Sequence, residues 1–239
     1  MSKQGIIPEI KEQALFIADA HYPHHGDAFL KILIKLENGE IKTPQLFLMG
    51  DIFDLLFGHN NYIQTFSKKA IELLQNISKT TEIIYLEGNH DFCLKEVFPN
   101  IKVYPREEQP IHFKLGEQDV YLSHGDKYET NFGYGLYSKL LRNRLLLTLL
   151  RPFEKLIIND RIAKLKKKKI CKKFSNYQER FEAIAKHYPE NSLIIEGHFH
   201  QSLVHKNYIS LPSLACQNRL AMVKENKIIF TNKFTQSSS

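Results

Sequence analysis

The sequence predicts an α/β fold, and three observations support that prediction. Short apolar stretches end in polar clusters at five points, helical patterns separate the first three stretches, and further strand-like segments follow. Strands connected by helices form mainly parallel sheets that helices cover on both faces. The chain of 239 residues is long enough for one such domain carrying a small insertion.

The five apolar stretches are predicted to be buried strands. Each is too short for a helix, and none alternates between apolar and polar residues. Helical patterns at residues 27–36 and 62–77 fill the gaps between the first three. The stretches are residues 14–22, 45–54, 81–91, 119–126 and 191–200.

Other segments are predicted to extend the sheet structure. Residues 101–105, 110–115 and 118–125 resemble consecutive strands, with a turn at Gly116 and Glu117. Residues 202–213 and 219–232 are predicted to form antiparallel edge strands, the second with a turn at Glu225 and Asn226.

Residues 130–188 differ from the rest of the chain. They are rich in Leu, Lys and Arg, have apolar residues at helical intervals and contain a break at Pro152, so we expect a helical cap insertion of two or three segments. The core is then residues 1–129 and 189–239. Residues 139–173 alone hold 13 basic and two acidic side chains, so the basic character of the chain is local.

Composition excludes several classes of protein. The chain is 43% hydrophobic and 25% charged, as in ordinary globular proteins, and has no apolar run that resembles a signal peptide or a membrane span. A cytoplasmic location is therefore expected. Cys93, Cys171 and Cys216 are odd in number and widely spaced, which predicts free thiols rather than a disulfide framework or a zinc knuckle.

Possible metal ligands follow all five predicted buried strands. Because ligands bind beyond the carboxyl ends of parallel strands, these residues are expected to converge on one site. Carboxylate, amide and imidazole donors without thiolates suit Mn²⁺, Fe²⁺ or Zn²⁺. Seven donors exceed the needs of one ion, which predicts two metals that share a carboxylate. The candidates are Asp19, His21, Asp51, Asn89, His124, His198 and His200.

The order of these motifs resembles that of the calcineurin-like metallophosphoesterase superfamily. Its blocks DxH, GDxxD, GNHD, HG and GHxH are matched here between residues 19 and 200. The resemblance implies a four-layered αββα sandwich with a dinuclear metal centre, in which Mn²⁺ is the expected metal and Fe²⁺ or Zn²⁺ the alternatives. It also implies hydrolysis of a P–O bond.

The resemblance assigns a role to each matched residue. It implies that Asp51 bridges the two metals, that His90 contacts the phosphate and protonates the departing oxygen, and that Asp91 orients the ring of His90. We expect Asp54 to hold a ligand imidazole. The first metal would have Asp19, His21, Asp51 and His200, and the second would have Asp51, Asn89, His124 and His198.

The insertion resembles the cap of the UDP-2,3-diacylglucosamine pyrophosphatases of lipid A synthesis. This branch implies cleavage of the substrate diphosphate to UMP and 2,3-diacylglucosamine 1-phosphate, and the basic cap would suit an anionic membrane surface at the inner face of the cytoplasmic membrane. The branch usually has Arg in GNRDF where this chain has His90, which weakens the substrate assignment. The implied substrate-binding residues are Asp126, Tyr128, Tyr137, Lys139, Arg142, Lys164 and Lys167.

Other interpretations remain open at this stage. A phosphodiesterase or nuclease of the same superfamily would use the local positive charge to bind nucleic acid, although few stacking aromatic residues accompany that charge. A scaffold that has lost its metals is disfavoured, because all seven candidate ligands are present. His24 and His25 are interpreted as solvated loop residues.

Overall fold

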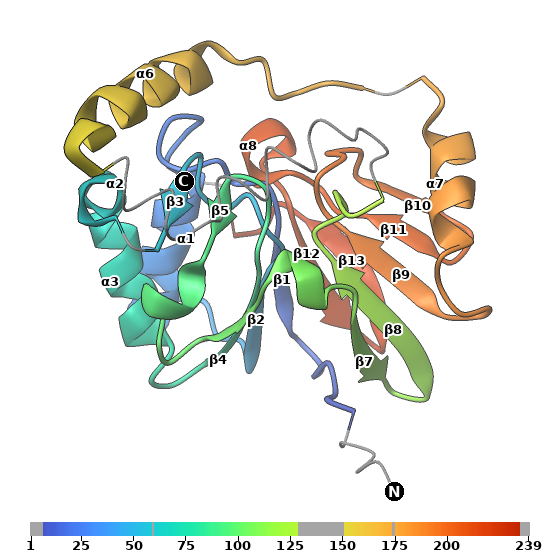
Figure 1. The fold of residues 1–239 in the computed structure, drawn as a ribbon. Helices are drawn as coiled ribbons and strands as arrows, with labels where there is room; N and C mark the ends of the chain where they lie inside the picture. Colours follow the sequence, from blue (N-terminus) through green and yellow to red (C-terminus); the bar gives the residue numbers. More distant parts are fainter. Residues whose placement is uncertain (1–6, 59, 129–150, 174, 235–239) are drawn as a thin grey trace, which may run out of the picture.

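The computed structural model describes residues 7–58, 60–128, 151–173 and 175–234. Two β-sheets lie face to face, and helices cover the outer faces (Figure 1). The predicted α/β class is confirmed, and the arrangement is the αββα sandwich. The strands that end in candidate ligands are divided between the two sheets rather than gathered in one.

The larger sheet has six strands in the order β13-β12-β1-β2-β4-β6. The central strands β1, β2, β4 and β6 run parallel, while β12 joins β1 in antiparallel fashion. The turn at Glu225 and Asn226 connects β12 to β13 as predicted, with both residues at positive φ. The strands are β1 (Leu15–Ile17), β2 (Gln45–Leu48), β4 (Glu82–Leu86), β6 (Lys102–Tyr104), β12 (Leu220–Lys224) and β13 (Lys227–Thr231).

The smaller sheet has five strands in the order β10-β11-β9-β8-β7. Strands β11, β9 and β8 run parallel, and β7 pairs with β8 through the predicted turn at Gly116. Residues 202–213 contain an antiparallel hairpin as predicted, but only its first strand lies at the edge, because the second pairs with β9. The elements are β7 (Ile111–Leu115), β8 (Gln118–Ser123), β9 (Leu193–Glu196), β10 (Leu203–His205), β11 (Tyr208–Ser210) and α8 (Leu214–Gln217).

Successive side chains along the buried strands point to opposite faces of the sheet, and this divides the core into layers. Leu15 and Ile17 of β1 face the helices α1 (Ala28–Glu37) and α3 (Lys68–Ile77), whereas Phe16 faces the other sheet. Between the sheets, Phe47 packs edge-on against Phe113 with ring centroids 5.5 Å apart. Both faces of the central strands are therefore buried, which explains their continuous apolar runs.

The helix predicted over residues 62–77 is two helices in the structure. These are α2 (Asn61–Thr65) and α3, and the break falls at the buried Ser67. The other small elements of this half of the chain are a two-strand ribbon and two 3₁₀ turns. The ribbon pairs β3 (Leu56–Phe57) with β5 (Asp91–Phe92), and the turns are η1 (Leu94–Glu96) and η2 (Arg106–Glu108).

The described part of the predicted insertion contains η3 (Arg151–Phe153), α6 (Glu154–Lys167) and α7 (Tyr177–Ala185). Ile158 and Ile162 of α6 pack on Phe57 and Phe92 of the ribbon. Helix α7 packs on the smaller sheet, where Phe181 stacks on Tyr208, so it forms the fourth layer of the sandwich. The leucine-rich run at 136–150 lies outside the described residues.

The expectation of three free thiols is wrong. Cys171 and Cys216 form a disulfide, and their Cα atoms are 5.5 Å apart. They are separated by 45 residues, so no local spacing indicated the pair. Cys93 is a free cysteine. Within the described part of the chain, no helix has the length and apolar character needed to cross a bilayer.

Candidate metal centre

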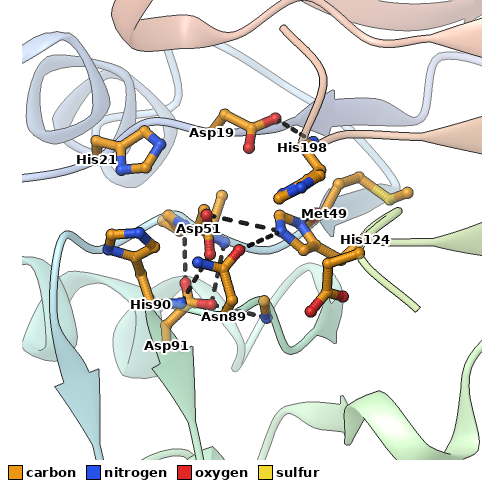
Figure 2. A network of polar contacts seen from close by, with 12 residues as sticks. Asp19, His21, Met49, Asp51, Asn89, His90, Asp91, His124 and His198 are labelled. Atoms are coloured by element: carbon orange, nitrogen blue, oxygen red, sulfur yellow. Dashed lines mark hydrogen bonds and ion pairs between the residues drawn. The ribbon is translucent and has the colours of Figure 1, made fainter. Parts of the chain in front are cut away.

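The loops that follow β1, β2 and β4 of the larger sheet meet those that follow β8 and β9 of the smaller sheet (Figure 2). The structure brings all seven predicted ligands to this place. Six of them fall into two groups of three whose potential ligand atoms lie within 4.8 Å of one another. Each group contains residues that follow strands of both sheets.

The first group consists of Asp19, His21 and His200, all buried. Nε2 of His200 lies 3.1 Å from Oδ1 of Asp19, and the other carboxylate oxygen of Asp19 accepts a hydrogen bond from the backbone N–H of His198 at 2.9 Å. Nε2 of His21 is buried and has no hydrogen-bond partner among the described residues. An unpaired buried nitrogen is costly unless something binds to it.

The second group consists of Asp51, His124 and His198. The Nδ1–H of His124 donates to the carbonyl of Met49 at 2.9 Å, which leaves Nε2 directed toward the group. That atom lies 3.3 Å from the side-chain oxygen of Asn89 and 3.6 Å from Oδ2 of Asp51. Asn89 therefore joins the second group, and Asp51 interacts electrostatically with His21 of the first group as well as with His124 and His198.

Five of the seven candidate ligands have left-handed backbone conformations. Such conformations are uncommon for residues with side chains, and they concentrate at functional sites. Gly88 is also required here, because a Cβ atom on it would lie 2.3 Å from Oδ1 of Asp51. The φ values are 50° for Asp19, 45° for His21, 50° for Asp51, 58° for His198 and 55° for His200.

The electrostatics of the site favour a bound cation. Burial alone lowers the pKa of His124, but the carboxylates of Asp51, Asp126 and Asp19 raise it to about 9. A ring that retains a proton in this way lies in a region of negative electrostatic potential, where a metal ion can replace the proton. Together with the oxygen and nitrogen donor set and the unpaired His21, this fits divalent metals.

Asp54 supports the first group, and it has more partners than predicted. Its Oδ1 lies 3.5 Å from Nδ1 of His21, but that nitrogen has no hydrogen-bond partner among the described residues, so the contact is an ion-pair distance only. His24 also contacts Asp54, through its backbone N–H at 2.9 Å and its Nδ1 at 3.1 Å, and Nδ1 of His25 lies 2.8 Å from it. The interpretation of His24 and His25 as solvated loop residues is therefore wrong.

Asp91 does not orient the ring of His90. Its carboxylate accepts hydrogen bonds from the backbone N–H groups of Asp51, Ile52 and Gly88 and from the hydroxyl of Tyr85. It therefore ties the loop after β2 to the loop after β4. The backbone carbonyl of Asp54, 2.7 Å from Nδ1, orients the ring of His90 instead.

His90 is neutral in the metal-free protein at neutral pH. Burial is the main cause, and with His21 and Lys168 it outweighs Asp51 and lowers the pKa of His90 to about 4. Its Nδ1–H donates to the carbonyl of Asp54, so Nε2 is directed away from that loop. A role as a proton donor therefore requires a bound anion that raises this pKa.

A cavity of about 160 Å³ opens at the candidate ligands. It is smaller than most pockets for whole drug-sized ligands, so it suits the phosphoryl end of a substrate. His21, Asp51, Asn89, His90, His198 and His200 line it, together with Phe199 and a segment after α6, namely Lys168, Lys169, Ile170 and Lys172.

None of the predicted substrate-binding residues that the structure describes lines the cavity. Asp126 is buried, and its carboxylate accepts from Nε of Arg106 at 2.7 Å. Tyr128 stacks on His187, and the exposed Lys164 pairs with Asp160 within α6. Lys167 ends α6 and does not line the cavity. Tyr137, Lys139 and Arg142 lie outside the described residues.

Sequence reasoning missed the segment after α6. Its lysines belong to a run, Lys166 to Lys169, in which sequence alone cannot distinguish the side chain at the cavity from those in solvent. Cys171 lies within this segment, but its pairing with Cys216, 45 residues away, was not indicated by any local spacing.

The sequence is similar to those of curated proteins. A UDP-2,3-diacylglucosamine hydrolase of Coxiella burnetii is 29% identical over 113 residues, which is 47% of this chain and 46% of the relative. One of Pseudomonas putida (strain W619) is 24% identical over 201 residues, 80% of this chain and 83% of the relative. The chain thus spans about half the length of the first of these relatives.

Among solved structures, a dimetal phosphatase from Danio rerio matches with a TM-score of 0.45 and 12% identity, covering 92% of this chain and 95% of the other. The family model described as calcineurin-like phosphoesterase matches residues 13–202. This range contains every candidate ligand, from Asp19 to His200. The chain therefore belongs to the calcineurin-like phosphoesterase family.

Proposed function

We propose that the protein is a metal-dependent phosphoester hydrolase that holds two divalent cations. The observation that carries the proposal is that two groups of ligand residues lie together: Asp51 of the second group also interacts electrostatically with His21 of the first, and five of the seven candidate ligands have left-handed backbone. Asp19, His21, Asp51 and His200 would hold one ion, and Asp51, Asn89, His124 and His198 the other. The oxygen and nitrogen donors favour Mn²⁺, with Fe²⁺ or Zn²⁺ as alternatives.

Residues of the chain would orient the catalytic groups and supply a proton, while the metals supply positive charge. When bound, two cations supply positive charge to the phosphoryl oxygens and lower the pKa of an attacking water. The carbonyls of Met49 and Asp54 hold His124 and His90 in defined tautomers. Once an anionic substrate raises its pKa, His90 delivers a proton from Nε2 to the departing oxygen.

We further propose UDP-2,3-diacylglucosamine as the substrate, cleaved to UMP and 2,3-diacylglucosamine 1-phosphate. The names of the relatives support this choice. So does an apolar surface beside the basic residues of α6, where Phe153, Leu156 and Ile157 are 59%, 73% and 45% exposed. Such a surface suits acyl chains and peripheral contact with an anionic membrane.

The Asp51→Asn variant tests the reaction class. It removes the carboxylate proposed to bind both ions, so hydrolysis of bis(4-nitrophenyl) phosphate with Mn²⁺ is expected to fall about a thousandfold or more. Metal content measured by mass spectrometry should fall with it. Asp27→Asn is the matched control, because Asp27 is 66% exposed and pairs only with Lys31 in the described chain. An Asp51→Asn protein that retains a tenth of wild-type turnover would contradict the proposal.

The substrate is tested separately by comparing UMP release from UDP-2,3-diacylglucosamine with cleavage of single-stranded DNA. Rapid UMP release with slow DNA cleavage is expected. The reverse result would transfer the proposal to the nuclease alternative and leave the reaction class unchanged.

A further inference from the structure

The segment at residues 168–172, here called the strap, crosses the metal centre. Helix α6 ends at Lys167, and Lys168 adopts an extended conformation with φ −71° and ψ 124°. In Figure 1 the residues that follow α6, up to residue 173, run across the end of the sandwich to which the strands carrying the candidate ligands lead. Lys168, Lys169, Ile170 and Lys172 line the same cavity as Asp51 and His90.

Three contacts hold the strap in this position. The carbonyl of Lys168 lies 3.3 Å from Nε2 of His25, whose other ring nitrogen contacts Asp54. The side-chain amide of Gln201 donates to the carbonyl of Lys172 at 3.2 Å. The disulfide from Cys171 to Cys216 lies between these two contacts along the strap and is the only covalent one.

The disulfide attaches the strap to an element that also holds the first ligand group. Cys216 lies in α8, and its Sγ is 3.5 Å from Nδ1 of His200. Ser213, at the start of α8, donates to the carbonyl of Asp19 at 2.8 Å. Gln217 of the same helix donates to the carbonyl of His200 at 2.5 Å. The strap is therefore fixed relative to the ligands.

The side chain of Lys168 in the strap contacts His90. Its Nζ lies 3.4 Å from Nε2 of His90. An ammonium group carries three donors, so a contact with the ring of His90 leaves others for an anion. Because candidate metal ligands line the same cavity of about 160 Å³ as Lys168, the group that fits there is anionic and compact.

We propose that the strap is the anion-binding part of the substrate site, that Lys168 binds a phosphoryl oxygen of the substrate beside His90, and that the Cys171–Cys216 disulfide positions it. This inference rests on the proposed function, because it names a residue that binds the phosphoryl group of the proposed substrate. It assigns the role to Lys168 rather than to Lys164 or Lys167, which the sequence indicated.

The first test measures binding of inorganic phosphate to the metal-loaded protein by calorimetry. Lys168→Ala is expected to weaken phosphate binding about tenfold, as for loss of one charge-assisted hydrogen bond, and to raise the KM for bis(4-nitrophenyl) phosphate similarly. Lys173→Ala is the matched control, because Lys173 is exposed and does not line the cavity. Metal affinity should be unchanged in both variants.

The second test examines the disulfide. Cys171→Ser, and Cys171→Ser with Cys216→Ser, should weaken phosphate binding to the same extent as Lys168→Ala, and combining Lys168→Ala with either should add little. Cys93→Ser is the control, and circular dichroism checks that each variant folds. Digestion with trypsin provides a further readout, because the released strap lysines should be cut faster than in wild type.

The outcomes separate the two proposals. If wild-type protein binds metals and phosphate but hydrolyses no phosphoester, the proposed function fails while the strap can still be judged by phosphate binding. If Lys168→Ala binds phosphate within twofold of wild type, the inference is overturned. It is also overturned if the effects of Lys168→Ala and Cys171→Ser are additive, because the disulfide would then not act through Lys168.

Discussion

His124 shows how a single ring prepares the site for a metal. Its Nδ1–H is used by the carbonyl of Met49, so only Nε2 is available to a ligand. The ring is completely buried beside Asp51 and Asp19. Loss of the Met49 contact would free the ring to rotate, although Met49 itself is not a ligand.

Metal affinity should rise with pH up to about 9. In the metal-free protein, burial lowers the pKa of His124 but its carboxylate neighbours raise it to about 9, so below that pH the ring carries a proton that a metal must displace. For each pH unit below 9, protonation of this one ring should therefore weaken the binding of Mn²⁺ by up to about tenfold.

Calorimetry in buffers of different ionisation enthalpy measures the protons released. Near neutral pH, His124→Gln should release about one proton fewer than wild type on metal binding. His187→Gln is a suitable control, because His187 stacks on Tyr128 outside the ligand groups. Equal proton release from wild type and His124→Gln would contradict the assignment.

At the residue scale, the motifs located the candidate ligands better than they assigned roles to the residues around them. Each ligand follows a strand end, a place that sequence pattern can locate. The roles of Asp54 and Asp91 depend on which carboxylate faces which loop, and that is decided by tertiary packing. Sequence reasoning therefore assigned to Asp91 an orienting role that the carbonyl of Asp54 performs.

At the element scale, α6 is held by a small apolar contact with the ribbon of β3 and β5. Phe57 and Phe92 stack with ring centroids 5.2 Å apart, and Ile158 and Ile162 cover them. The strap begins where α6 ends, so this contact also fixes the start of the strap.

Ile162→Ala should lower the free energy of unfolding by about 2–4 kcal/mol, because it removes buried methyl groups from this contact. Ile157→Ala, at a position that is 45% exposed, should change it by less than about 1 kcal/mol. Urea denaturation followed by circular dichroism measures both. Similar losses in the two variants would mean that α6 does not depend on the ribbon.

The break between α2 and α3 shows why the periodicity of apolar residues alone does not locate the ends of helices. The apolar spacing from Ile63 to Leu74 continues through the break at Ser67, and no Gly or Pro marks it. The five buried strands were predicted correctly because their apolar runs and polar ends are both strong signals. The division of those strands between two sheets is a long-range choice that no local pattern encodes.

At the scale of the whole molecule, each ligand group joins the two sheets. Asp19 follows β1 of the larger sheet and His200 follows β9 of the smaller one, while Asp51 and His124 make the equivalent pair in the second group. Bound cations would therefore connect the two halves of the sandwich across their common end.

Removal of metal should lower the melting temperature. Metal at a thousandfold excess over its dissociation constant stabilises the folded state by about 4 kcal/mol, which for a chain of this size is on the order of 10 °C. Calorimetry with Mn²⁺ and with EDTA measures the difference. The Asp51→Asn variant should show a much smaller one. A melting temperature that does not respond to EDTA in the wild type would argue against resident metals.

The division of each ligand group between two sheets has a consequence for assembly. If the gene were split between Leu115 and Gln118, one fragment would contain Asp19, Asp51 and Asn89, and the other His124, His198 and His200. Neither fragment alone would retain manganese tightly. Uptake of the ion would then signal that the two pieces had recombined, so metal capture provides a direct readout of complementation between separately expressed halves.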